Sequence, residues 1–420
     1  MRLADVFTRV VGPDVPIEFV AYDGSRSGPA NAPVRLDLRS PIGLSHIASA
    51  PGELGFARAY VSGSLEVHGD MHTALTTLLN LPLNGIADIP REVRTSLITK
   101  ALAARLWWPV KPPAQEHRQH GRRHSKRRDS KAISHHYDVS NRFYEYVLGP
   151  SMAYTCAVYP TLDATLEEAQ YTKFDLVARK LGLRPGMRLL DVGCGWGGMV
   201  MHAAQHYGVK ALGVTLSKQQ AEWAQKAIVE RGLSDLAEVR HSDYRDVAEG
   251  DFDALSSIGL TEHIGEAQLP AYFTFLYDKL KPGARLLNHC ITRPNNLEAA
   301  KTGAFINRYV FPDGELEGPG KLMSIMTNTG FEVRHEENLR EHYAMTLKGW
   351  CENLDRNWDA AVAEVGVGTA RVWRLYMAAS RVGFDINQIQ LHQMLGVKLD
   401  GIRSHMSLRP DWEPAAETVS

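Results

Sequence analysis

Hydrophobic and polar positions follow two different patterns along the chain, and short mixed segments fill the first part. PVRLDLRS (33–40) alternates apolar and polar residues, which predicts a half-buried strand. Residues 71–81 have the apolar spacing of an amphipathic helix, and Pro82 should stop it because proline cannot continue the hydrogen-bond ladder. We therefore expect a small α+β domain over residues 1–110.

Strand-like and helix-like segments alternate regularly in the second part. Short apolar runs predict strands at 187–192, 210–216, 237–241, 253–259 and 284–292. A helix should follow the first strand, and another should run from Ser217 as N-cap to Gly232. This alternation predicts a mostly parallel, doubly wound sheet in residues 132–420, although it does not give the order of the strands.

Residues 111–131 separate the two patterns. KPPAQEHRQHGRRHSKRRDSK is almost free of apolar side chains, so it cannot bury a core and is expected to be a linker. Its basic part, 118–131, has three interpretations: a solvated linker, attraction to anionic lipid head groups, or contact with nucleic-acid phosphates. With a lipid substrate, membrane attraction is the favoured functional interpretation.

Length and composition add broad limits. The chain has 420 residues, more than the roughly 250–300 that one core usually holds, and its net charge of -1 points to no particular partner. Cys156, Cys194, Cys290 and Cys351 form no CxxC pair, which argues against a disulfide framework or a structural metal. No signal peptide and no membrane span are evident, so we expect a cytoplasmic protein.

The turn LLDVGCGWGG is the first chemical signal. Gly193, Gly195 and Gly198 follow a strand and precede a helix, where a bare backbone can approach a ligand. The spacing fits S-adenosylmethionine (SAM), a dinucleotide, or close packing alone. A dinucleotide site expects an acid about 20 residues later. None is present there, which disfavours NAD and also departs from the commonest SAM pattern.

Polar substitutes for that acid lie at the second and third strands. Thr215 ends the second strand, and Gln220 follows one helical turn later. Asp243 and Tyr244 follow the third strand and offer an acid and a ring to an adenine, although Asp243 is also a suitable helix cap.

Eight motifs make the pattern specific. They are HYDVSNRFYEYVLGPSMAYTCAVYP, LDVGCGWGG, GVTLSKQQ, DYRDV, TEHIG, NHCIT, FINRYVFPDGEL and HYAMTLKGW, in that order. Together they resemble the cyclopropane fatty acid synthases and the related mycolic acid cyclopropane synthases. The resemblance implies a Rossmann-like class I SAM-dependent methyltransferase fold, with a mixed, mostly parallel seven-stranded sheet and a smaller α+β N-terminal domain.

The resemblance also implies a bicarbonate ion beside the sulfonium methyl group of SAM. Its cradle would consist of Cys156, Glu262, His289, the Ile291 backbone and Tyr343. The implied SAM contacts are Tyr154, Thr155, Gly193, Gly195, Thr215, Leu216, Gln220, Asp243 and Tyr244. Taken singly, the acid, the histidine and the cysteine of the cradle each have an ordinary structural explanation, but their joint occurrence in ordered motifs favours the cradle.

The expected reaction is methyl transfer to a cis double bond of a phospholipid acyl chain. The resulting carbocation needs an apolar, aromatic lining, and Phe305, Tyr309 and Tyr343 are candidates, with ordinary core packing as the alternative. Proton loss without ring closure would give a 10-methylene chain, and loss with closure would give a cyclopropane.

Departures from the cyclopropane pattern bear on the product. His135, Arg58 with Ala59, and the Tyr22-Asp23-Gly24 turn look more like the branch that makes 10-methylene fatty acids. Alternatives are a cyclopropane synthase, an RNA methyltransferase and a SAM-binding module without turnover. Expected partners are an unsaturated phospholipid at the inner membrane surface, a separate flavin-dependent NAD(P)H reductase and a second copy in a homodimer, but not nucleic acid.

Overall fold

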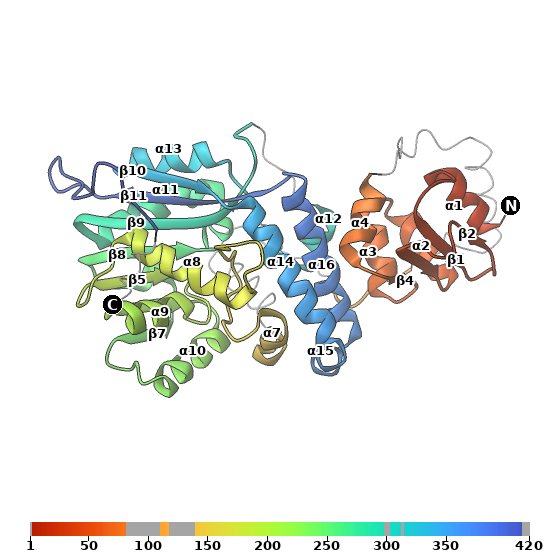
Figure 1. The fold of residues 1–420 in the computed structure, drawn as a ribbon, viewed down its shortest axis with the longest axis horizontal. Coiled ribbons are helices and arrows are strands. Elements are labelled where there is room, and N and C mark those ends of the chain that lie inside the picture. Colours follow the sequence, from red (N-terminus) through yellow and green to blue (C-terminus); the bar gives the residue numbers. More distant parts are fainter. Residues whose placement is uncertain (1, 81–109, 117–138, 298–302, 312–314, 414–420) are drawn as a thin grey trace. The chain divides into compact units, whose positions relative to one another are not determined.

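The computed structural model describes residues 2–80, 110–116, 139–297, 303–311 and 315–413 (Figure 1). The predicted basic arm, 118–131, and His135 lie outside these residues. The chain divides into two compact units. The first comprises residues 1–120, 303–312 and 354–382, and the second comprises 121–302, 313–353 and 383–420. The sequence prediction had placed 303–312 and 354–382 in the catalytic domain.

The first unit has a four-stranded sheet in the order β2-β1-β3-β4. Its strands are β1 (Ile17–Ala21), β2 (Arg26–Ser27), β3 (Val34–Leu38) and β4 (Leu65–His68). Its helices are α1 (Leu3–Val11), α2 (Pro41–Ser49), α3 (Glu53–Val61), α4 (Met71–Leu79), α12 (Ala304–Tyr309), α15 (Trp358–Val365) and most of α16 (Val367–Asp385). The predicted strand at 33–40 is present as β3. The predicted helix at 71–81 is present as α4, where the Asp70 carboxylate accepts the Thr73 backbone N–H.

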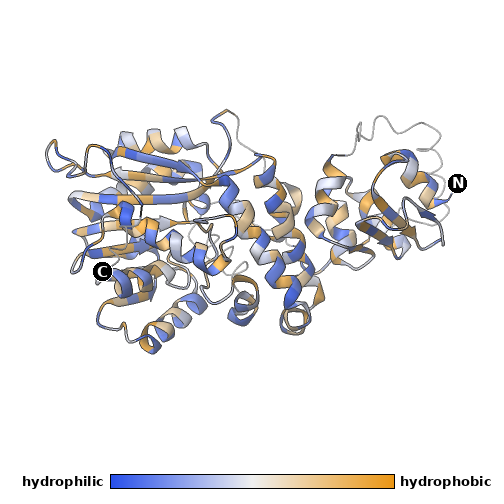
Figure 2. Ribbon diagram, in the orientation of Figure 1, coloured by the Kyte–Doolittle hydropathy of each residue, from blue (hydrophilic) through white to orange (hydrophobic). Residues whose placement is uncertain are grey.

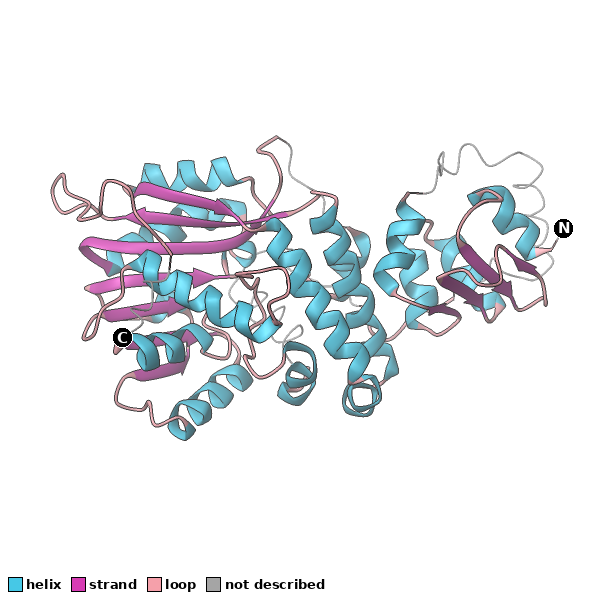
Figure 3. Ribbon diagram, viewed as in Figure 1, coloured by secondary structure: helices cyan, strands magenta, loops and turns pink. Residues whose placement is uncertain are grey.

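The second unit has a seven-stranded sheet in the order β10-β11-β9-β8-β5-β6-β7. Figure 3 draws its strands in magenta. Its strands are β5 (Arg188–Val192), β6 (Lys210–Thr215), β7 (Ala237–His241), β8 (Phe252–Ile258), β9 (Leu280–Thr292), β10 (Glu332–Asn338) and β11 (Gln390–Val397). The five predicted strands are all present and pair in parallel. β11 pairs antiparallel with both β9 and β10, and neither β10 nor β11 was predicted.

The helices of this unit cover both faces of its sheet. They are α7 (Asn141–Leu148), α8 (Leu166–Leu181), α9 (Gly198–Tyr207), α10 (Lys218–Glu230), α11 (Leu269–Lys279), α13 (Pro319–Thr329) and the larger part of α14 (Arg340–Arg356). Short 3₁₀ turns are η2 (Tyr244–Asp246), η3 (Thr261–His263) and η4 (Glu266–Gln268). The side chain of Ser217 accepts the Gln220 backbone N–H, so the predicted N-cap of α10 is confirmed. Among the described helices, none is both long and apolar enough to cross a bilayer.

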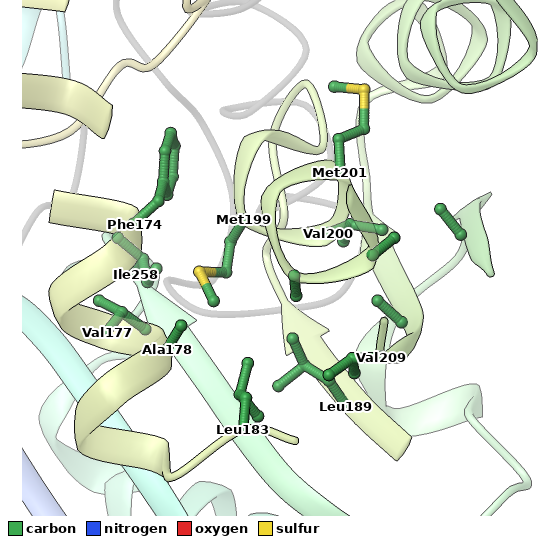
Figure 4. Close-up of a cluster of buried hydrophobic side chains, with 14 of the residues drawn as sticks. Phe174, Val177, Ala178, Leu183, Leu189, Met199, Val200, Met201, Val209 and Ile258 are labelled. Carbon is green, nitrogen blue, oxygen red and sulfur yellow. The ribbon is translucent and has the colours of Figure 1, made fainter. Parts of the chain in front are cut away.

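Successive residues of β5 bury against opposite faces of the sheet. Leu189 belongs to the buried cluster that contains Val177 of α8 and Met199 of α9 (Figure 4), whereas Leu190 belongs to the cluster that contains Phe273 of α11. Side chains alternate along a strand, and a parallel sheet covered by helices buries both sets. In Figure 2 the flanking helices accordingly carry both hydrophobic and hydrophilic residues.

The order of the strands places the glycine turn at the switch point of the sheet. From β5, the chain passes through α9 to β6 on one side, whereas β8 pairs on the other side of β5. Open α/β sheets bind ligands at the carboxyl ends of strands where the order reverses in this way. We therefore expect a ligand to bind at the residues that follow β5, β6 and β8.

Candidate active site

The turn after β5 has a backbone that favours glycine. Gly193 and Gly195 have φ angles of +75° and +53°, a region that side chains with a Cβ rarely adopt. The N–H groups of Gly193 and Cys194 both donate to the Val214 carbonyl oxygen, which ties the turn to β6. A Cβ on Gly198 would lie 2.6 Å from the Phe174 ring. The sequence pattern thus serves both ligand access and close packing.

A cavity of about 210 Å³ opens beside this turn. Six of the predicted SAM contacts line it: Gly193, Gly195, Thr215, Leu216, Gln220 and Tyr244. The Thr215 hydroxyl donates to Gln220 Oε1 at 2.8 Å, so the two polar side chains that stand in for the missing acid form one buried pair. Among the described residues that line this cavity, none carries a carboxylate.

A second cavity of about 70 Å³ also borders the turn. It shares Gly193, Gly195, Gln220 and Gly259 with the first, and it adds the predicted contacts Tyr154 and Thr155. Asp191 also lines it and accepts a hydrogen bond from the Ser256 hydroxyl at 2.6 Å. Burial raises the pKa of Asp191 to about 6. The glycine turn therefore borders two cavities that share part of their lining, which suits an extended ligand such as SAM.

Asp243 is the predicted SAM contact that borders neither of these cavities. Its carboxylate accepts the Arg245 backbone N–H at 3.0 Å and pairs with the Arg245 guanidinium at 2.5 Å. It acts as the N-cap of η2, which was the alternative interpretation from the sequence. Tyr244, its neighbour, lines the first cavity, and its ring meets that of Phe275 edge-on at 5.2 Å.

Glu262 and Ile291 of the predicted cradle are in direct contact. The Ile291 N–H donates to Glu262 Oε1 at 2.6 Å, whereas Glu262 Oε2 is buried without a hydrogen-bond partner among the described residues. Burial raises the pKa of Glu262 to about 7. A buried oxygen without a partner is costly unless a bound group satisfies it.

The His289 imidazole has a buried donor without a partner among the described residues, whereas Glu262 has a buried acceptor. Its Nδ1 lies 3.2 Å from Gln393 Nε2, and Gln393 Oε1 accepts from the Lys180 ammonium at 2.7 Å. The lysine fixes the orientation of the amide, so the amide nitrogen donates to Nδ1 and the neutral ring carries its proton on Nε2. That Nε2 is buried without a partner among the described residues, and burial lowers the pKa of His289 well below its usual value.

The cradle is linked to the cavities through one peptide. β8 and β9 pair so that Ile258 lies opposite His289, and the Gly259 N–H donates to the His289 carbonyl oxygen at 2.8 Å. Gly259 lines both cavities. Among the described residues, neither Glu262 nor His289 lines these two cavities, and Glu262 lines a third one together with Ile291 and Glu317. A carboxylate oxygen and an imidazole N–H without partners are the acceptor and the donor that an ion such as bicarbonate needs.

Cys156 and Tyr343 lie near the start of α14. The Cys156 thiol donates to the Ala157 carbonyl oxygen at 3.1 Å and more weakly to that of Leu339, and burial raises its pKa. A protonated, buried thiol is not a nucleophile. The Tyr343 ring packs 4.5 Å from that of Phe384. These two residues belong to the second unit, whereas the predicted aromatic residues Phe305 and Tyr309 are buried in the first.

Several residues at this site were not predicted from the sequence. His263, Gln268 and Phe275 line the first cavity, Lys173 lines the second, and Gln393 contacts His289. His263 directly follows Glu262 in the TEHIG motif, so its position next to the site was available from the sequence. Lys173 and Gln393 gave no local signal, because a lysine in a helix or a glutamine in a strand is usually exposed.

Comparisons with known proteins agree with this geometry. Residues 124–394 match the mycolic acid cyclopropane synthetase family. The probable fatty acid methyltransferase Rv3720 of Mycobacterium tuberculosis is 56% identical over 409 residues, which are 95% of this chain and 95% of that protein. The tuberculostearic acid methyltransferase UfaA1 of the same organism is 29% identical over 406 residues, 93% and 90% of the two chains.

A related solved structure contains a form of the cofactor. The mycolic acid cyclopropane synthase CmaA1, complexed with S-adenosylhomocysteine (SAH) and CTAB, aligns with a TM-score of 0.60 and 32% identity over 64% of this chain and 97% of that one. SAH is SAM without its transferred methyl group, which supports SAM as the cofactor of this chain. The resemblance inferred from the motifs is confirmed: the chain belongs to the mycolic acid cyclopropane synthetase family and has the class I fold of SAM-dependent methyltransferases.

Proposed function

We propose that this protein transfers a methyl group from SAM to the cis double bond of an oleoyl-type phospholipid acyl chain and releases a 10-methylene product. The observation that carries the proposal is that Glu262 Oε2 and His289 Nε2 are both buried without a hydrogen-bond partner among the described residues. When bound, SAM supplies an electrophilic methyl group and bicarbonate supplies an oxygen base. An alkene is a weak nucleophile, so the protein has to align the reactants and exclude water.

The protein's own residues support proton removal at one defined place. Glu262 is fixed by the Ile291 N–H, and His289 is fixed by Gln393, so both groups present a single atom. An acceptor and a donor together would hold a bicarbonate ion in one orientation and one protonation state. Hydrogen-bond geometry rather than a strong intrinsic base would then select the proton that leaves.

The methylene product is favoured over ring closure by two observations. The sequence departs from the cyclopropane pattern at Arg58 and Ala59, and relatives at 56% and 29% identity are named as fatty acid and tuberculostearic acid methyltransferases. The second candidate is a cyclopropane synthase, which the similarity to CmaA1 at 32% identity favours. Both reactions need the same cation and the same base.

The test is incubation of the purified protein with methyl-labelled SAM and dioleoyl phospholipid vesicles, with and without bicarbonate. Gas chromatography–mass spectrometry of the acyl chains should show a 10-methylene branch, and the rate should fall when bicarbonate is removed. A cyclopropane product would establish the second candidate. Label found in RNA but absent from the lipid would overturn both.

Glu262→Gln is the variant that tests the cradle. Its amide oxygen can still accept from Ile291, but it cannot orient a bicarbonate O–H as a carboxylate does. We expect kcat to fall by about 10²- to 10⁴-fold, the usual contribution of a positioned base, with unchanged affinity for SAH. Glu266→Gln is the matched control. Glu266 lies four residues after Glu262, and its exposed carboxylate forms an ion pair with Lys321.

The proposed product also implies a partner and a location. Conversion of a methylene group to a methyl branch needs a hydride, so we infer a separate flavin-dependent NAD(P)H reductase. The lipid substrate implies action at the inner face of the membrane. A saturated methyl branch formed by this chain alone would contradict the inferred partner.

A further inference from the structure

Lys173 of α8 is a fully buried lysine at the edge of the second cavity. Its ammonium donates to the Thr155 hydroxyl at 3.0 Å and lies 3.5 Å from the centre of the Phe174 ring. Among the described residues, no carboxylate lies within ion-pair distance of it. One hydroxyl and one ring face are little compensation for a buried ammonium group that has three N–H donors.

A second buried lysine on the same helix, Lys180, has an acidic partner within the protein. Lys180 lies seven residues, or about two helical turns, further along α8, so both side chains project from the same face. Lys180 is also fully buried, but it forms an ion pair with Glu337 and a hydrogen bond with Gln393 at 2.7 Å. The comparison shows that α8 satisfies one buried lysine within the protein and leaves the other facing a cavity.

The groups around Lys173 do not neutralise it. Burial is the largest influence on the pKa of Lys173 and lowers it, whereas the Cys156 thiol and the Asp191 carboxylate of β5 raise it by less. Among the described residues, neither group lies within ion-pair or hydrogen-bond distance of the lysine. Burial lowers the pKa of His202 on α9 and of His289 on β9, and the charge of Lys173 adds a smaller lowering effect to both. Burial dominates this balance and lowers the pKa of Lys173 to about 7.

The cavity identifies the missing partner as an anion. The glycine turn, Tyr154, Thr155 and Asp191 line it together with Lys173, so a ligand bound there would lie close to the lysine. SAM carries a sulfonium, an ammonium and a single carboxylate, and an ammonium group of the protein would attract only the last. We propose that Lys173 binds the carboxylate at the amino-acid end of the cofactor.

This inference rests on SAM as the cofactor and not on the identity of the lipid. Isothermal titration calorimetry with SAH and with 5′-methylthioadenosine separates the two ends, because the second compound lacks the amino-acid group. Lys173→Met should weaken SAH binding by roughly 10- to 100-fold, the effect of a lost charge-assisted hydrogen bond, and should change the affinity for 5′-methylthioadenosine by less than about twofold. Lys226→Met, which removes an exposed lysine of α10 that pairs with Glu230, should alter neither affinity.

Each other outcome has a distinct meaning. Equal loss of both ligands in Lys173→Met, or unchanged SAH affinity, would overturn the role of Lys173. Failure of the wild-type protein to bind either compound would instead contradict SAM as the cofactor.

A measurement on the wild-type protein covers the case in which the variant does not fold. At pH 8, SAH binding should take up a proton onto Lys173, and 5′-methylthioadenosine binding should not. The difference can be read from binding enthalpies in buffers of different ionisation enthalpy. Equal proton uptake for the two compounds would also overturn the proposal.

Discussion

Glu262→Gln is expected to stabilise the ligand-free protein above pH 7, although it removes the carboxylate proposed to hold bicarbonate. Burial raises the pKa of Glu262 to about 7 from an ordinary value of 4.5, and Oε2 has no partner among the described residues. The folded state therefore binds the proton more tightly than the unfolded state. By linkage, stability falls as pH rises from about 4.5 to about 7, and the loss is complete above pH 7.

The size of this loss follows from the shift in pKa. The pKa rises from 4.5 to about 7, and at 1.36 kcal/mol per unit this shift corresponds to a cost of about 3 kcal/mol for the ionised carboxylate. Glutamine avoids that cost and keeps an oxygen for the Ile291 N–H. The variant should therefore gain less than about 1 kcal/mol at pH 5 and up to about 3 kcal/mol at pH 8.

Urea unfolding in bicarbonate-free buffer at these two pH values measures the gain. Glu266→Gln serves as the control, because it breaks an exposed ion pair with Lys321 and should cost at most about 1 kcal/mol. A Glu262→Gln protein that is less stable than the wild type at pH 8, or equally stabilised at both pH values, would refute the assignment of a buried, uncompensated carboxylate.

Two further substitutions test the packing of the turn and the orientation of the imidazole. Gly198→Ala should lower stability by about 1–3 kcal/mol, because its methyl group would lie 2.6 Å from the Phe174 ring. Gly250→Ala, with no described atom within 4 Å of the added methyl, is its control in thermal unfolding, and equal midpoints would argue against the clash. Gln393→Leu should lower kcat by about 3- to 10-fold and raise the bicarbonate concentration for half-maximal rate, because His289 loses its 3.2 Å contact. Steady-state kinetics with unchanged bicarbonate dependence would contradict that role.

The residues nearest the glycine turn could be predicted because their chemistry is local. Ser217, Thr215 and Gln220 follow directly from one strand and the helix after it, and the structure places them as expected. The five parallel strands were also evident, since each is a short buried run between turns. Asp243 shows the limit of local signals, because one side chain suited both a cofactor contact and a helix cap.

The contacts that complete the site could not be predicted because they join distant parts of the chain. Gln393 lies 104 residues from His289 and 213 residues from Lys180. The sequence around Gln393 contains no motif that predicts either contact. β10, with the sequence EVRHEEN, is too polar to suggest a strand of a buried sheet. Lys173 lacks any sequence feature that distinguishes it from a solvent-exposed helix lysine.

The position of β11 constrains how the protein acquires its activity. β11 is synthesised after β9 and β10, yet it pairs between them in the finished sheet. Until residues 390–397 emerge from the ribosome, β9 has an unpaired edge and β10 has no sheet to join. Exposed edges of this kind attract other strands, so a nascent chain halted before this point would be prone to aggregate. The seven-stranded sheet can therefore be completed only after its last strand has been translated, well after the glycine turn.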